Sequence, residues 1–223
     1  MSSPDVRVGV VVSAPYQENT YIAHLEGRKD CLVVDPGLDP DEILAYLAAQ
    51  GLSPAAILIT HGHSDHIAGN GRLKERFPAC PIVASHRDAS ALTDPQLNLS
   101  AAFGFDLRSP PADTLVGEGD VYSAAGFDLA VREIPGHSPG HVVFIWRGGT
   151  PILVFGGDVL FAGSVGRTDF PGGSFDELAT NIHAKLFTLP DDTQVLPGHG
   201  PITTIGQEKR HNPFVGEAAN VED

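Results

Sequence analysis

The sequence is poor in several residue types, and each scarcity narrows the class of protein. Only 2 of its 223 residues are cysteine, too few for a disulfide-rich framework. Lysine and arginine number 14 against 28 aspartates and glutamates, so the formal net charge is −14. A chain this acidic lacks the basic footprint of a nucleic-acid-binding protein. No stretch approaches the ~18 consecutive apolar residues of a membrane span.

The two cysteines also indicate in which cellular compartment the protein is expected. Cys31 and Cys80 lie outside any motif, and Cys31 opens the apolar stretch 31–34. We expect two buried free thiols rather than a disulfide, as is usual in a reducing cytosol. The apolar stretch Val8–Val12 is too short for the core of a signal peptide, so we expect a cytoplasmic protein. The length and the 42% hydrophobic content suit one domain covering residues 1–223.

Histidine is concentrated in one short segment. Residues 60–66 read Thr-His-Gly-His-Ser-Asp-His and follow the apolar run Ala55–Ile59, which predicts a buried strand. His61 and His63 are two residues apart, so in extended chain both rings point to the same side and can reach one cation. Asp65 and His66 follow at once and would face a second position. The alternative is a surface loop that happens to be rich in histidine.

Three further segments place a histidine or an aspartate directly after a predicted strand. His137 follows the alternating stretch Leu129–Ile134, Asp158 follows Ile152–Phe155, and His199 follows Val195–Pro197. A single histidine in such a place is more often structural than functional. Together, however, four strand ends would deliver histidine or aspartate to one edge of the fold. This pattern favours a metal site with two positions.

The order His-x-His-x-Asp-His, followed by a distant His, Asp and His, resembles the metallo-β-lactamase superfamily. The resemblance covers nearly the whole chain, including Asn19–Tyr21 and Val34–Gly37. Segments Phe161–Phe170 and Glu208–Phe214 resemble the short, single-domain glyoxalase II-like branch. The resemblance implies an α+β fold, a four-layer αββα sandwich.

The resemblance also implies a ligand set for two divalent metal ions per chain. It implies that zinc is bound, with iron or manganese as alternatives, since imidazole and carboxylate ligands suit all three. Asp158 would bridge the two ions, and its presence argues against a true β-lactamase, which places another group there. The first ion would be held by His61, His63 and His137, and the second by Asp65, His66 and His199.

The implied reaction is hydrolysis of a small-molecule thioester, such as the glutathione thioester lactoylglutathione. A hydroxide shared by the two metals would attack the carbonyl, with Asp65 orienting it and Asp158 holding the bridge. A thiolate leaving group, with a pKa near 8.5, needs little help from a general acid. We expect Thr60, Ser138 and His141 to orient the ligand side chains.

Arg167 stands where, by resemblance, a basic residue contacts glutathione. Its alternative is an exposed loop arginine. The pattern departs from full-length glyoxalase II, in which a helical C-terminal domain grips glutathione through basic and tyrosyl residues. Here only about two dozen residues follow His199, and Gly200-Pro201 lies where a tyrosine is expected. The glutathione clamp is therefore incomplete, which leaves room for another thioester or for a partner subunit. Oligomeric state does not follow from the sequence.

A second function belongs to another class of enzyme. The segment Gly166–Phe170, which reads Gly-Arg-Thr-Asp-Phe, also resembles mononuclear iron persulfide dioxygenases. By that resemblance the same first motif would serve a triad of two histidines and one carboxylate, drawn from His61, His63 or His137 and Asp158. His141 and the segment Pro197–Gly200 favour the hydrolase. A closed structural zinc site, with four ligands, does not account for seven candidate ligands.

Helix signals complete the prediction. A helix is predicted over 40–50, with Asp39 as its cap and Gly51 at its end, and another over 67–77. A third is predicted over 174–186, with Ser174 and Glu177 forming a capping box. The least regular stretch, 95–111, is predicted to be a loop near the site.

Overall fold

Two six-stranded sheets form the middle of the molecule. The computed structural model describes residues 5–220. The first sheet has the order β1-β2-β3-β4-β5-β6 and the second β14-β13-β10-β9-β8-β7. The first contains β1 (Val6–Ser13), β2 (Glu18–Leu25), β3 (Asp30–Val34), β4 (Ser53–Leu58), β5 (Ile82–Ser85) and β6 (Thr114–Val116). The second contains β7 (Val121–Ala124), β8 (Phe127–Glu133), β9 (Val142–Trp146), β10 (Leu153–Gly157), β13 (Gln194–Pro197) and β14 (Thr203–Thr204).

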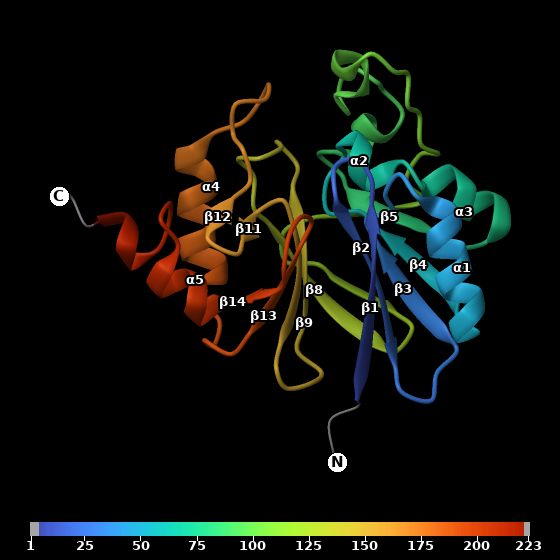
Figure 1. Cartoon of the computed structure of the whole chain (residues 1–223), viewed down its shortest axis with the longest axis horizontal. Helices are drawn as coiled ribbons and strands as arrows, with labels where there is room; N and C mark the ends of the chain where they lie inside the picture. Colours follow the sequence, from blue (N-terminus) through green and yellow to red (C-terminus); the bar gives the residue numbers. More distant parts are fainter. Residues whose placement is uncertain (1–4, 221–223) are drawn as a thin grey trace.

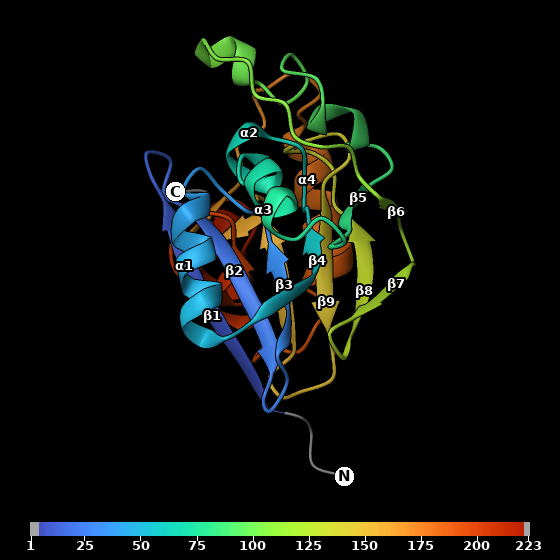
Figure 2. The same ribbon diagram turned by 90° about the vertical axis from the view of Figure 1, so that its right-hand side faces the viewer.

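Helices cover the outer face of each sheet, as Figures 1 and 2 show. The first sheet carries α1 (Pro40–Gln50) and α3 (Asn70–Arg76), with the short α2 (Ser64–Ile67) at its edge. The second carries α4 (Phe175–Asn181), the π-helical turn η3 (Ile182–Leu186) and α5 (Ile205–His211). The remaining elements are the hairpin β11 (Leu160–Phe161) and β12 (Ser164–Val165) and the 3₁₀ turns η1 (Ala89–Leu92), η2 (Ser100–Phe103) and η4 (Glu217–Asn220).

Three apolar clusters separate four layers, so the predicted αββα sandwich is confirmed. Strand β9 shows how the sequence produces it. Its five residues are all buried, with Phe144 and Trp146 in the cluster between the sheets and Val143 and Ile145 in the cluster beneath α4. A strand covered on both faces needs a continuous apolar run rather than an alternating one.

Parallel pairing brings the ligand segments to one edge. In the first sheet β3, β4, β5 and β6 run parallel, and in the second β10 and β13 do. The carboxyl ends of β4, β10 and β13 therefore lie at the same edge, where loops of both halves meet (Figure 1). His61, Asp158 and His199 each follow one of these ends.

The helix predictions need three corrections. Helix α1 has the predicted bounds, but Asp39 makes no capping bond, because its carboxylate accepts the Ala14 N–H at 2.7 Å. The helix predicted over 67–77 begins only at Asn70, since Gly69 packs against Pro36 and donates its N–H to the Pro36 carbonyl. Ser174 caps α4 through the Glu177 N–H, but the Ser174 N–H donates to Gly136 instead of completing a capping box.

Within residues 5–220, no helix has the length and apolar character needed to cross a membrane. Cys31 and Cys80 are buried and free, as predicted. Burial raises the pKa of the Cys31 thiol to about 12 and that of Cys80 to about 11.

These raised pKa values predict thiols that do not react in the folded protein, because the thiolate is the nucleophile. At pH 8 roughly one Cys31 side chain in ten thousand would be ionised. A disulfide reagent such as Ellman's should modify neither cysteine of the native, pre-reduced protein within minutes. Both should react after unfolding in guanidinium, which is the control. Rapid reaction of either thiol in the native protein would contradict the prediction.

Candidate metal centre

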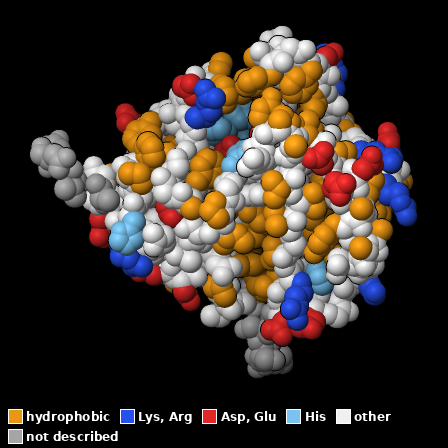
Figure 3. Space-filling view, viewed as in Figure 1, with side chains coloured by type: hydrophobic (Ala, Val, Ile, Leu, Met, Phe, Trp, Pro, Cys, Tyr) orange, Lys and Arg blue, Asp and Glu red, His pale blue; other side chains and the backbone are white. Residues whose placement is uncertain are grey.

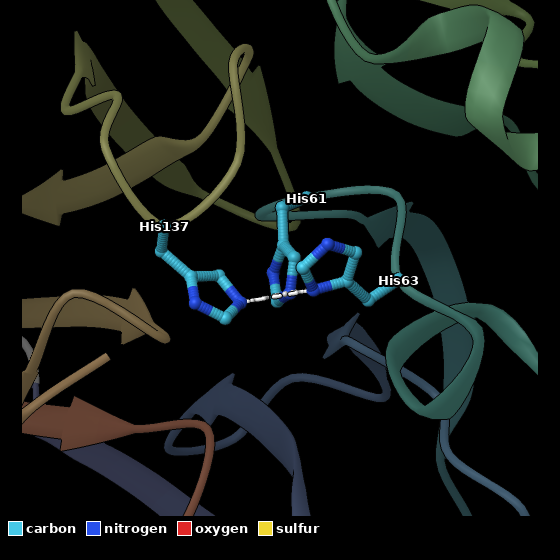
Figure 4. A group of neighbouring side chains, drawn as sticks. All are labelled: His61, His63 and His137. Atoms are coloured by element: carbon cyan, nitrogen blue, oxygen red, sulfur yellow. Dashed lines mark hydrogen bonds between the residues drawn. The ribbon is translucent and has the colours of Figure 1, made fainter. Parts of the chain in front are cut away.

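Three histidine rings converge at the edge where the two halves meet. The nearest nitrogens of His61, His63 and His137 lie 2.9–3.3 Å apart, as Figure 4 shows. His61 and His63 come from the loop after β4, and His137 from the loop between β8 and β9. Sequence positions 61 and 137 thus meet only through the fold.

The second nitrogen of most of these rings is engaged by an acceptor, which decides where the proton sits. His137 Nδ1 lies 2.8 Å from the Arg167 carbonyl oxygen, and His61 Nδ1 lies 3.1 Å from the Thr60 hydroxyl oxygen. The Thr60 hydroxyl donates in turn to Asp35 at 2.6 Å, so it accepts from His61. Both Nε2 atoms consequently carry a free lone pair toward the centre, the form that a metal ligand requires.

The electrostatics favour neutral rings in this cluster. Burial, reinforced by the neighbouring imidazoles, lowers the pKa of His63 to about 3 and that of His61 well below its usual value. Both are therefore neutral at pH 7. In a tetrahedral zinc site with bonds of 2.0–2.1 Å, neighbouring ligand atoms lie roughly 3.3 Å apart. The spacing of the three nitrogens is close to this value.

A second group lies beside the first. Asp65, His66 and His199 bring one ligand atom each within 4.8 Å of one another. The Nε2 of His199 lies 3.4 Å from the Asp65 carboxylate, while its Nδ1 lies 3.1 Å from the Tyr16 carbonyl oxygen. His66 is fully buried, and its Nδ1 contacts the Asp35 carboxylate at 3.1 Å. These contacts again leave the Nε2 atoms facing the centre.

Asp158 lies between the two groups. Its Oδ2 is 3.5 Å from His137 Nε2 and 3.5 Å from His199 Nε2, and its Oδ1 is 3.4 Å from His66 Nε2. Gly198 permits this approach, because a Cβ at that position would overlap Asp158 Oδ1 and the His66 ring. The carboxylate is thus placed to serve both positions at once.

The charges in the second group call for a cation. Burial opposes ionisation of Asp158, but the His66, His137 and His199 imidazoles outweigh it and lower the pKa of this carboxyl. Burial likewise opposes charging of His66, but Asp158 and Asp65 raise the pKa of His66 well above its usual value. A proton on His66 balances the carboxylates in the metal-free chain, and a divalent ion would replace that charge.

Two buried atoms without a hydrogen-bonding partner give an independent test of whether these residues fit a bound metal. Within residues 5–220, His66 Nε2 and Asp158 Oδ1 are buried and have no hydrogen-bonding partner, although buried polar groups normally have one. The two atoms lie 3.4 Å from each other, so one cation can contact both. The residues present therefore fit a dinuclear metal site, since imidazole and carboxylate suit zinc, iron and manganese alike.

Outer residues hold the ligands, and some of them are not those expected. Thr60 contacts His61, but the Ser138 hydroxyl donates to Asp88 rather than to a ring. His141 accepts the Asp158 N–H at 3.0 Å and stacks on His61. The expectation that Ser138 orients an imidazole is thus wrong, because the Asp88 carboxylate is the nearer partner.

Asp35 and Asp88 are outer residues whose roles were not predicted. Asp35 accepts the Thr60 N–H at 2.8 Å and also contacts His66, so it supports one ligand of each group. Asp88 accepts from the Gly62 N–H within the ligand loop. For Asp35 the signals in the sequence are its place directly after an apolar strand and its position in the segment Val34–Gly37, which belongs to the resemblance. Asp88 has no comparable signal.

An opening of about 400 Å³ leads to the two groups. Arg167 lines it, with its guanidinium paired to the Asp169 carboxylate through two contacts of 2.7 Å and placed 4.1 Å over the Phe170 ring. The loop 95–111 also reaches the opening through Asn98, Leu99 and Phe103, as expected from the sequence.

The tail segment supports the wall that carries Arg167. Glu208 is buried and accepts the Gly163 N–H at 2.9 Å, and Asn212 donates to the Ser164 carbonyl at 2.9 Å. Asn212 also donates to Glu208. Helix α5 is thereby tied to the hairpin β11–β12, three of whose residues, Phe161, Ser164 and Val165, line the opening.

Comparison with known proteins agrees with this geometry. The family model for the metallo-beta-lactamase superfamily matches residues 14–199. The chain is 40% identical to a probable metallo-hydrolase, YqgX, of Bacillus subtilis, over 90% of this chain and 93% of that protein. It is 33% identical to the hydroxyacylglutathione hydrolase GloC of Haemophilus influenzae, over 94% and 98%.

Solved structures show the same similarity. The crystal structure of BLEG-1 B3 metallo-beta-lactamase superposes with a TM-score of 0.89 at 37% identity, covering 94% of this chain and 99% of that one. The di-iron-bound form of TTHA1623 superposes with a TM-score of 0.80 at 38% identity, covering 93% and 100%.

The contacts of Asp35 predict a loss of metal affinity in Asp35→Asn. The amide would present N–H groups to Thr60 or His66, whose own hydrogens point at this carboxylate. Loss of such an outer partner typically weakens metal binding 10–100-fold, so we expect zinc affinity to fall within about that range. Competition with a chromophoric chelator measures it.

Asp113→Asn is the matched control. Its carboxylate also accepts a backbone N–H, from Ile82 at 2.8 Å, and contacts Lys74, away from the ligand loops. The role assigned to Asp35 is refuted if the two variants bind zinc equally well.

Proposed function

This chain belongs to the metallo-β-lactamase superfamily, and we propose that it is a metal-dependent hydrolase that cleaves a thioester. The substrate we propose is a glutathione thioester such as lactoylglutathione. The observation that carries the proposal is the place of Asp158, whose two oxygens face both histidine groups. A carboxylate shared in this way suits a pair of cations rather than one.

Two divalent ions bound at these groups would lower the pKa of water at the site toward 7 and polarise the substrate carbonyl. Asp65 contributes a second function. Burial raises the pKa of its carboxyl, but His66 and His199 outweigh burial and lower it, so Asp65 is ionised at neutral pH. It lines the opening and can accept a proton there, which orients the nucleophile toward the carbonyl.

The leaving group sets the demand for a general acid. Within the described residues that line the opening, His63, His137 and His199 are the only imidazoles, and all three point their nitrogens at the centre. No imidazole is thereby left over for general-acid catalysis. A thiol with a pKa near 8.5 leaves as a thiolate without such help, whereas an amine does not. The site therefore suits a thioester better than an amide.

Two observations support glutathione as the thiol carrier. The similar protein of Haemophilus influenzae is described as a hydroxyacylglutathione hydrolase. Arg167 lines the opening, and its exposed ion pair with Asp169 is weak enough to open, so the guanidinium can contact a substrate carboxylate.

A second candidate function is a mononuclear iron persulfide dioxygenase. The group His61, His63 and His137 with the nearby Asp158 also contains two histidines and a carboxylate, the usual set for non-heme iron. The second group of ligands is unnecessary for that chemistry, which is why we prefer the hydrolase.

Metal content distinguishes the two functions. Protein purified without chelators should contain close to two metal ions per chain by elemental analysis, because two groups of three ligands are present. One iron per chain, together with oxygen consumption in the presence of glutathione persulfide, would establish the dioxygenase instead.

Asp158→Ala tests the shared carboxylate. We expect thioester hydrolysis to fall by more than the ~100-fold that loss of an outer partner costs, and metal content to drop below two ions per chain. Asp176→Ala, which removes an exposed carboxylate from the first turn of α4, should keep both values. Turnover near the unmodified rate in Asp158→Ala would refute the proposal of a dinuclear hydrolase. A penicillin or cephalosporin in the same assay tests the activity named for BLEG-1.

A further inference from the structure

One wall of the opening is apolar and partly uncovered. It consists of Tyr16, Leu99 and Phe103, which we call the aromatic wall. The rings of Tyr16 and Phe103 meet edge-on with centroids 6.1 Å apart. Phe103 is 52% exposed, and the neighbouring Leu97 and Phe105 are 52% and 36% exposed. Apolar groups left uncovered beside a site are typical of a surface that a ligand covers.

The aromatic wall is held in place rather than loosely attached. Asn98 is fully buried, donates to the Leu107 carbonyl at 3.0 Å and accepts the Ser100 N–H at 3.0 Å. Its carbonyl accepts the Ser64 N–H at 2.9 Å, which ties the loop to the metal-ligand segment. Leu99 adopts φ of +68°, a conformation rare for a residue with a Cβ. Such unusual backbone collects at binding sites, where it aims a side chain.

The facing wall has a different character. It is formed by residues of the second half, from β11 to Phe170, and carries Arg167, the only cationic side chain among the described residues that line the opening. In Figure 1 the loop 95–111 and the loop after β12 rise on opposite sides of the top of the molecule. Figure 3 shows hydrophobic side chains gathered at the top of this face, near histidine side chains. Phe161, Val165 and Phe170 make this wall apolar as well, so the two walls differ in the guanidinium of Arg167, which only this wall carries.

We propose that the substrate is a thioester with an apolar acyl group, which lies against the aromatic wall while the thiol carrier lies on the side of Arg167. This inference rests on the proposed thioester hydrolysis. A lactoyl group is short and carries a hydroxyl, so it would leave Phe103 uncovered. A longer aliphatic acyl group would cover it and exclude water from the carbonyl.

A chain-length series with one thiol carrier tests the proposal. The metal-loaded protein is assayed with acetyl-, butyryl-, hexanoyl- and lactoylglutathione, and kcat/KM is measured for each. Burial of one methylene group contributes about 0.8 kcal/mol, so kcat/KM should rise roughly fourfold for each methylene that the wall covers. Hexanoylglutathione should exceed lactoylglutathione by at least about tenfold. Calorimetric binding of S-hexylglutathione and S-methylglutathione, which cannot be hydrolysed, should show the same order.

Two substitutions distinguish the contribution of the aromatic wall from the effect of losing any exposed apolar side chain. Phe103→Ser should reduce the ratio of hexanoyl to acetyl kcat/KM, because the added methylenes lose their contact surface. Leu115→Ser, on β6 and 55% exposed, removes a comparable apolar side chain that does not line the opening, and should keep the ratio. Both positions are half exposed, so neither change should prevent folding.

The outcomes are distinct. A rising series that is flattened in Phe103→Ser and kept in Leu115→Ser supports the proposal. A flat series, or preference for lactoylglutathione, overturns it and leaves the thioester hydrolase standing. Absence of hydrolysis with all four thioesters, in protein shown to hold two metals, overturns the hydrolase and this inference together.

Discussion

The structure depends on placing a buried carboxylate among imidazoles at the edge of the sandwich. Asp158 is 7% exposed and contacts His66, His137 and His199, and its Oδ1 lacks a hydrogen-bonding partner. Burial of a carboxylate is costly unless another charge compensates it, and a divalent cation bound here would replace the His66 proton in that role. The pKa values of His61 and His63 beside it are lowered, so these rings stay neutral and keep a lone pair for a metal. This cluster of buried polar side chains is therefore stabilised by a bound metal, and it would be unfavourable as a purely structural part of the core.

This constraint explains contacts that join the two halves of the molecule. Asn19, at the start of β2, donates to the carbonyls of Pro197 and Gly200, and its N–H donates to Gly198 at 2.7 Å. These bonds hold the His199 segment of the second sheet against the first. The apolar cluster between the sheets supplies the driving force for association, while these polar bonds set the relative position of the ligand loops.

The metal groups and the walls of the opening have separate tasks. Chemistry at two cations can serve thioesters, lactams or other electrophiles, so the fold and ligands leave the substrate open. Discrimination then comes from the loops that surround the cations. Here one side presents Tyr16, Leu99 and Phe103, and the other presents Arg167, in the loop that follows the hairpin tied to Glu208 and Asn212. Differences in these loops can change the substrate without disturbing the ligands.

The sequence alone indicated the strands that precede the ligand segments, the helix α1 and the candidate ligands. Apolar runs and the spacing of His61 and His63 are local patterns, and they follow from the periods of strand and helix. The resemblance then supplied the four layers, which the structure confirms. Tertiary structure alone decided the role of Asp35, the partner of Ser138 and the failure of Asp39 to cap α1. Each of these depends on a residue more than 20 positions away. A polar side chain takes the nearest suitable partner, and only the folded chain determines which partner is near.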